Sequence, residues 1–318
     1  MTILFAATEP QSFDSIGSVN SISTAPQIDT DYSRIGCQLA SANARYLATL
    51  GTSQTITALG GEELWLHGRI WISGNGGAAT APFFYLRDTT GAATGLSNTT
   101  PGIRPMVQGA AVGSGIVRPA TAFGIFDIRI HAGGIDYYLD GLLQEAITSN
   151  LDGVTFTSIE IERGASQVVA SEIVLATTNT IGLRVGTSVV SAQGSDDAMA
   201  GDFTSVDELN TDDSDFVSSL NVGEQESFAT TTLSPTGTQL TPIAVAASAR
   251  GRQGTLSGGP TDFDIFVTIG ANRFVIGGAD MPTVFGAGSV VVANQNPATA
   301  AAWGAEANDI EFGLVSKA

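Results

Sequence analysis

The chain has 318 residues, of which 13 are basic and 31 acidic, and its formal net charge is −18. A surface this acidic repels phosphate backbones, which argues against nucleic-acid partners. No apolar run approaches the ~20 residues that cross a bilayer, so we expect no membrane insertion. The N-terminal residues lack the basic start and apolar stretch of a signal peptide, so we expect synthesis in a cytoplasm.

The 38 glycines, together with many Ser and Thr and few helix-forming runs, favour short strands and tight turns. A short strand is predicted first at 3–5, and weaker ones at 45–50 and 53–59. The strand predicted at 63–73 has two unlike faces, one of Leu and Ile and the other of Trp, His and Arg. Further strands are predicted at 82–87, 102–108, 123–131, 154–163 and 171–176.

The strongest local signal is the turn at Asp140 and Gly141, which stand between Tyr137–Leu139 and Leu142–Leu143. A two-residue type I′ turn needs a positive φ at both central residues, which Gly adopts freely and Asp more readily than most residues. The pattern predicts a hairpin and hence an antiparallel sheet.

Acidic residues gather in the second half of the chain, where no basic residue occurs between Arg184 and Arg250. After this stretch, strands are predicted at 226–231, 243–250, 263–269, 273–276, 289–293 and 310–315. We therefore expect an all-β protein with a jelly-roll sandwich at 1–190, an acidic connector at 191–225 and a second, smaller antiparallel sandwich at 226–318.

Glu160 and Glu162 are the first candidates for chemistry. Their i, i+2 spacing on a strand puts both carboxylates on one face, about 6.5–7 Å apart, which is near the separations that glycosidases use. The strand resembles the acid-rich strand of laminarinase-like glycoside hydrolases, but Arg163 follows and the third acid is missing. The alternative is an ordinary solvated strand face.

The polar face of strand 63–73 is the candidate ligand-binding surface, formed by Trp65, His67, Arg69 and Trp71. Indole rings stack on sugar rings, and imidazole and guanidinium groups hydrogen-bond to hydroxyls. The alternative is that this face packs under a loop or against a neighbouring subunit. We expect no zinc site, since His67 and His131 are the only histidines.

Cys37 is the only cysteine, so no intrachain disulfide forms, and we expect the thiol to be a small apolar filler. Nothing predicts a nucleophile, and we expect no catalytic residues and no enzyme activity. Carboxylate pairs that could share calcium do not continue into a full binding loop; they are Asp29/Asp31, Asp213/Asp215 and Asp262/Asp264. We therefore expect no cofactor, with calcium as the one alternative, and no phosphate loop at Gly74–Gly77 or Gly258–Gly259.

Three segments resemble the concanavalin A-like (laminin-G-like) jelly roll, namely Phe126–Ile130, Tyr137–Leu143 and Ser171–Ala176. Other stretches are similar to segments of tailed-bacteriophage structural proteins that join such a lectin-like domain to a second β domain. These stretches are 171–184, 202–208, 211–216, 296–303 and 310–314.

The resemblance implies a non-enzymatic virion component on the tail, a fibre or the capsid surface. Its expected partners are copies of itself, other virion proteins and, as a further expectation, host surface glycans. The calcium positions of plant lectins are not matched in this sequence. Two alternatives stay open: a glycan-cleaving enzyme that uses Glu160 and Glu162, and a free carbohydrate-binding module.

Overall fold

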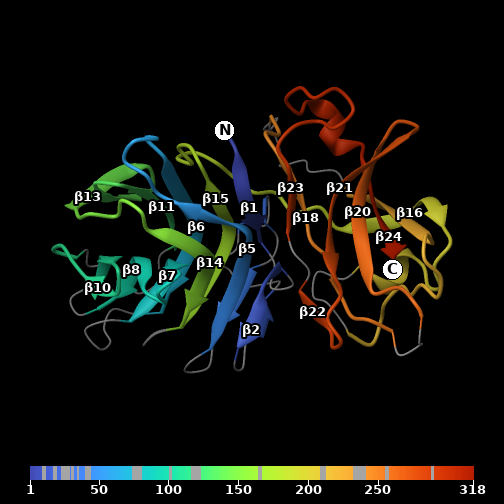
Figure 1. Ribbon diagram of the computed structural model, residues 1–318, viewed down its shortest axis with the longest axis horizontal. Helices are drawn as coiled ribbons and strands as arrows, with labels where there is room; N and C mark the ends of the chain where they lie inside the picture. The colour runs from blue at the N-terminus through green and yellow to red at the C-terminus, as the bar shows by residue number, and fades with distance from the viewer. Residues whose placement is uncertain are drawn as a thin grey trace. The chain divides into compact units, whose positions relative to one another are not determined.

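The computed structural model falls into two compact units (Figure 1). Unit 1 comprises Met1–Asp29 and Ile35–Val185, and unit 2 comprises Thr30–Arg34 and Gly186–Ala318. The structure describes residues 1–8, 12–16, 20–22, 29, 32–33, 36–39, 44–73, 81–99, 102–115, 123–163, 167–207, 213–231, 241–254, 258–287 and 290–318. Over these ranges the fold is all-β, with antiparallel sheets in both units. None of the described helices is long and apolar enough to span a bilayer.

Unit 1 contains an eight-stranded sheet in the order β13-β12-β11-β6-β15-β4-β3, with β1 also paired to β15. The strands of this sheet are β1 (Ile3–Ala7), β3 (Asn20–Ile22), β4 (Gly36–Leu39), β6 (Glu63–Ile72), β11 (Phe123–His131), β12 (Gly134–Leu139), β13 (Leu142–Thr148) and β15 (Val168–Ala176).

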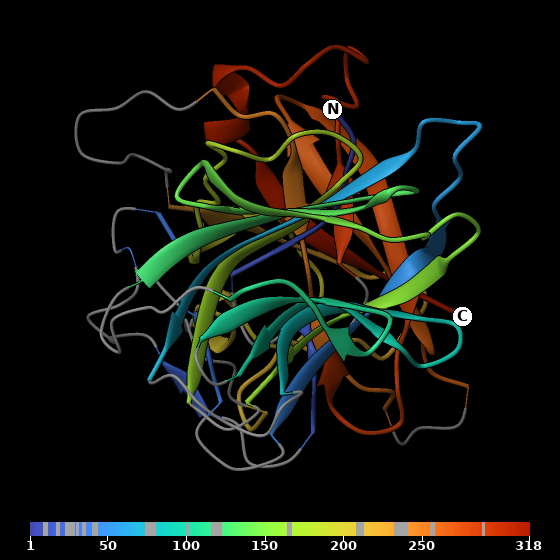
Figure 2. The same cartoon turned by 90° about the vertical axis from the view of Figure 1, so that its left-hand side faces the viewer.

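A seven-stranded sheet completes unit 1, in the order β10-β9-β8-β7-β14-β5-β2. The strands of this sheet are β2 (Asp14–Ile16), β5 (Arg45–Thr55), β7 (Pro82–Asp88), β8 (Ala93–Asn98), β9 (Ile103–Val107), β10 (Ala110–Ala111) and β14 (Thr155–Glu162). Figure 2 shows the two layers, with the green strands β11 to β13 in one and the teal strands β7 to β9 in the other.

The core of unit 1 lies between these sheets. Phe126 of β11 stacks on Tyr137 of β12, with ring centroids 6.0 Å apart, and Phe83 of β7 meets Phe126 edge-on at 6.3 Å. Gly68 of β6 faces Phe84 so closely that a Cβ atom there would lie 2.9 Å from the ring. The predicted jelly-roll sandwich is confirmed in its all-β, two-sheet architecture.

The predicted hairpin is also confirmed. Leu139 pairs with Leu142, and the two residues between them have positive φ, 50° at Asp140 and 78° at Gly141. The Asp140 carboxylate accepts a hydrogen bond of 2.8 Å from the Ile125 backbone amide. This bond ties the turn to the neighbouring strand β11.

Unit 2 is built on a five-stranded sheet in the order β16-β17-β24-β20-β21, with two short ladders, β18-β23 and β19-β22. Val267, Trp303 and Ile310 form a buried cluster in this unit. The elements are β16 (Val190–Asp197), η2 (Phe203–Ser205), β17 (Gln225–Thr230), β18 (Val245–Ala247), β19 (Arg250–Gly251), β20 (Asp262–Ile269), β21 (Asn272–Asp280), β22 (Gly286–Ala287), β23 (Val291–Ala293), η3 (Ala305–Asn308) and β24 (Glu311–Lys317).

The expectation of a separate acidic connector at 191–225 is wrong. Strand β16 lies in this stretch and pairs with β17, so the stretch belongs to unit 2. In this stretch, hydrogen bonds from Asn221 and Ser219 lower the pKa of Glu224 to about 2. Directly after it, Glu226 is fully buried and accepts hydrogen bonds from Gln193 and from the Met199 amide.

Candidate functional site

A cluster of polar side chains lies on the outer face of the seven-stranded sheet. Ile159 and Ile161 of β14 are fully buried and share the core face with Phe84. Side chains alternate between the faces of a strand, so Glu160 and Glu162 point outward. In the strand register Glu160 pairs with Tyr85 of β7, and Glu162 pairs with Arg45 of β5.

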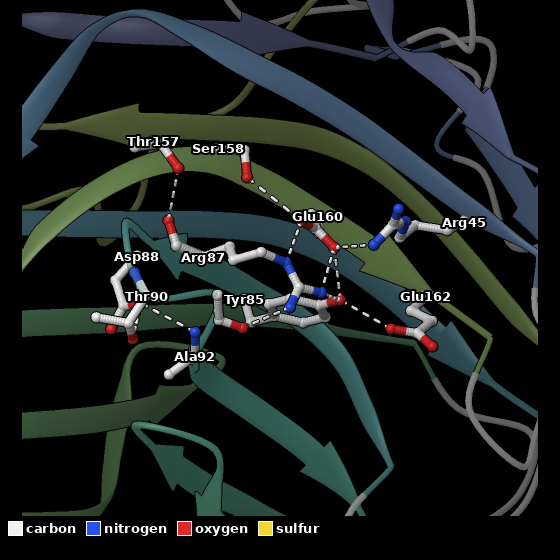
Figure 3. A network of polar contacts seen from close by, with 11 residues as sticks. Arg45, Tyr85, Arg87, Asp88, Thr90, Ala92, Thr157, Ser158, Glu160 and Glu162 are labelled. Atoms are coloured by element: carbon white, nitrogen blue, oxygen red, sulfur yellow. Dashed lines mark hydrogen bonds and ion pairs between the residues drawn. The ribbon is translucent and has the colours of Figure 1, made fainter.

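Glu160 is the centre of this cluster (Figure 3). Its side chain has no exposed surface. Oε1 accepts from Arg87 Nε at 2.5 Å and from Ser158 Oγ at 3.3 Å. Oε2 accepts from Arg87 Nη2 and the Tyr85 hydroxyl, both at 2.7 Å, and from Arg45 Nη1 at 3.1 Å. Five donor groups therefore converge on one carboxylate.

These contacts decide the protonation state of Glu160. Burial works to raise its pKa, but the hydrogen bonds from Arg87 and Tyr85 and the charges of Arg87 and Arg45 outweigh it, so the pKa of Glu160 lies below its ordinary value. Hydrogen bonding to Glu160 in turn raises the pKa of Arg87. The carboxylate is thus held ionised and cannot donate a proton at neutral pH.

Tyr85 links the two glutamates. Its hydroxyl oxygen lies 2.7 Å from Oε2 of Glu160 and 2.7 Å from Oε2 of Glu162, and it accepts from Arg87 Nη2 at 2.8 Å. Burial is the main reason why the pKa of Tyr85 is raised, followed by hydrogen bonding to Glu160. A neutral phenol has one proton, so the two carboxylates compete for it.

Arg87 is fixed from its other side by the turn between β7 and β8. Asp88 accepts hydrogen bonds from the Thr90 amide and hydroxyl and from the Ala92 amide, and Arg87 Nη1 donates to the Gly91 carbonyl at 2.7 Å. The turn therefore presents the guanidinium to Glu160 in one orientation.

A glycosidase needs one carboxyl group that holds a proton and another that is free to act as base or nucleophile. The two oxygens of Glu160 accept from five donor groups within the cluster, and its pKa lies below the ordinary value. The groups that reach the surface are Arg45 and Arg87, whose side chains are 28% and 29% exposed, and the half-buried Glu162.

The predicted ligand face of β6 is not an exposed platform. Trp65 is only 4% exposed, stacks on Tyr138 with centroids 5.6 Å apart, and donates from Nε1 to Glu63. His67 is fully buried, with Nδ1 2.7 Å from Asp127 Oδ1.

The other two predicted ligand residues, Arg69 and Trp71, are half-buried. Arg69 lies 3.9 Å from Asp29. Thr180, from the segment after β15, donates to Asp127 at 2.6 Å and so reaches the same buried pair. Trp65 and His67 are therefore covered within unit 1, whereas Arg69 and Trp71 keep part of their surface exposed.

The described members of the Asp pairs do not gather around a metal. Asp29 pairs with Arg184, Asp213 with Arg250 and Asp264 with Lys317, while Asp31 and Gly74–Gly77 lie outside the described residues. Within the described ranges no three His, Cys, Asp or Glu side chains come together. Cys37 is buried, as expected for a filler.

Comparisons with known proteins give structural neighbours only, since no protein-family model and no curated protein matches the chain. The T. cruzi calreticulin globular domain has a TM-score of 0.42 and 12% identity, over 56% of this chain and 89% of that chain. The cellulose induced protein Cip1 has a TM-score of 0.36 and 13% identity, over 52% and 87%. The carbohydrate binding module CBM66 from Bacillus subtilis has a TM-score of 0.33 and 10% identity, over 51% and 93%.

Unit 1 is a β-sandwich of two antiparallel sheets, as its own strand order shows. The neighbours are similar to the chain in fold, and at these values they say nothing about its ligand.

Proposed function

We propose that the protein is a non-enzymatic structural component of a tailed-bacteriophage particle, on its tail, a fibre or the capsid surface. We further propose that unit 1 contacts host surface glycans through the outer face of its seven-stranded sheet. The observation that carries the non-enzymatic part is the state of Glu160, which is buried, ionised and bound by two arginines and a tyrosine.

We propose the glycan contact on the seven-stranded sheet and not on β6 because the side chains of the two surfaces differ in burial. His67 has no exposed surface, whereas Arg45, Arg87 and Glu162 reach solvent from neighbouring strands. Guanidinium and carboxylate groups fixed in one geometry bind hydroxyls with little loss of side-chain entropy. The particle role rests on the sequence similarity of 202–208, 211–216, 296–303 and 310–314 to phage structural proteins.

Two experiments test the proposal. Peptide mass spectrometry of purified particles should find the chain at a fixed copy number, and its absence from particles would overturn the virion role. Binding to a glycan panel by the purified chain should give retention without cleavage. Binding of no glycan at all would overturn the second part and leave the first standing.

If the protein is instead a glycan-cleaving enzyme, a cleavage assay would give a different result. Cleavage of a polysaccharide that disappears in both Glu160→Gln and Glu162→Gln, with folding intact, would establish it and overturn the non-enzymatic proposal.

A further inference from the structure

The cluster around Glu160 has balanced local charge. Arg45 and Arg87 supply two positive charges, and Glu160 and Glu162 supply two negative ones. At physiological ionic strength the screening length is about 8 Å, so a small ligand there meets these four groups and the exposed carboxylate of Asp14, which lies opposite Leu47 on β2 and adds a negative charge. An anionic sugar would find no excess of positive charge, and the net charge of −18 adds repulsion at longer range.

Arg45 and Glu162 have hydrogen-bonding capacity to spare. Within the described residues, only Nη1 of Arg45 has a partner, Glu160, and only Oε2 of Glu162 has one, Tyr85. The two residues are directly opposite each other on β5 and β14. Cβ atoms in such a pair are about 4.5–5.5 Å apart. A cationic donor group and an anionic acceptor therefore stand side by side.

This pair matches two neighbouring hydroxyls of a sugar ring. One hydroxyl accepts from the guanidinium, while the other donates to the carboxylate. Leu47, two residues beyond Arg45 on the same face and half-buried, offers apolar surface for the C–H side of a ring. Glu160 and Tyr85 hold the two charged groups in place before a ligand arrives, which lowers the entropy lost on binding.

We infer that this site takes a neutral sugar, recognised through two adjacent hydroxyls by Arg45 and Glu162, and discriminates against sugars that carry a carboxylate or sulfate. The inference rests on the proposed glycan contact and goes further by naming the ligand class and the residues that select it.

The test is equilibrium binding of the full chain, at physiological salt, to matched oligosaccharides that are neutral or are capped with sialic acid, uronic acid or sulfate. The wild type should bind a neutral member at least tenfold more tightly than its anionic partner. Arg45→Gln should lose at least tenfold in affinity for the neutral sugar. Glu162→Gln should weaken neutral binding and narrow the gap to the anionic partner, since it removes the repelling charge.

Matched controls come from the eight-stranded sheet, where Arg129 and Glu63 form a comparable pair at 2.6 Å. Arg129→Gln and Glu63→Gln make the same charge changes and should leave affinity and selectivity unchanged. Thermal melts of all four variants show whether each is folded, and Glu162→Gln keeps the test decisive if Arg45→Gln does not fold.

Preferential binding of the anionic members, or neutral binding that neither site variant weakens, would overturn this inference and leave the proposed glycan contact standing. Binding of no member of either kind would overturn both.

Discussion

At the scale of single residues, Glu160 is a buried anchor for the polar side chains around it. Its burial would be costly for an isolated charge. Arg45, Arg87, Tyr85 and Ser158 offset that cost with five hydrogen-bond contacts. This arrangement depends on the negative charge of Glu160, because the two guanidinium groups and the phenol are positioned around it.

Glu160→Gln should therefore lower the free energy of unfolding by about 2–3 kcal/mol, since a neutral amide replaces a buried, charged acceptor. Urea denaturation followed by tryptophan fluorescence measures the loss. Glu162→Gln is the control on the same strand: it has one described partner, Tyr85, and is more exposed. Its cost should stay below about 1 kcal/mol, and equal losses in the two variants would contradict the anchor role.

The same residue predicts a pH dependence. The folded pKa of Glu160 lies below its ordinary value of 4.5, so its stabilising effect is fully present above that value and is lost as the pH falls through the lower, folded pKa. The stability gap between the wild type and Glu160→Gln should thus shrink when urea titrations are taken from about pH 7 to about pH 3. A gap that stays constant over this range would show that the charge of Glu160 does not stabilise the fold.

At the scale of elements, the hairpin around Asp140 depends on backbone conformation. Gly141 has φ of 78°, and its added Cβ would meet only the Ile181 side chain, at 3.4 Å. Gly141→Ala should cost about 1–2 kcal/mol from the left-handed conformation alone. Gly51→Ala in β5 is the control, because Gly51 has no positive φ and nothing within 4 Å of the added atom. Similar melting temperatures for the two variants would contradict this account of the turn.

The hairpin was predictable because its signal is local. Strand β8 was not, since Ala93–Asn98 is buried along its whole length but has small and polar residues without alternation. Two strands were predicted at 45–50 and 53–59, yet the single strand β5 runs from Arg45 to Thr55. Strand propensity yields to pairing with neighbours that are distant in the sequence.

The candidate site, like the fold, was predictable only where its signal is local in the sequence. The spacing of Glu160 and Glu162 correctly places them on one face, but their partners Arg45 and Arg87 are 115 and 73 residues away from Glu160. The alternation of side-chain types along β6 predicts two different faces but does not predict which of them is covered. The complete burial of His67 and the contact of Thr180 with Asp127 show that His67 is enclosed.

At the scale of the whole molecule, the two units differ in extent from the expected domains. Unit 2 includes β16, and the amide of Thr187 donates to the Tyr32 carbonyl, both within unit 2. In unit 1, Arg184 binds Glu172 and Asp29, residues from two distant parts of the chain.

A fragment of residues 186–318 should melt cooperatively with β-type circular dichroism. A fragment of residues 220–318 lacks β16, and Glu226, which is fully buried, loses its donors Gln193 and Met199. The thermal transition of the 220–318 fragment should be broader than that of the 186–318 fragment, or several degrees lower. Equal melting of the two fragments would show that β16 adds nothing to unit 2.

The measurement that tests the central claim most directly is mass spectrometry of a neutral oligosaccharide panel incubated with the full chain, alongside Glu160→Gln and Glu162→Gln. A non-enzymatic, glycan-contacting protein predicts that the wild type binds a neutral oligosaccharide and that all oligosaccharides are recovered intact from all three incubations. Shortened products formed by the wild type and by neither variant would contradict it.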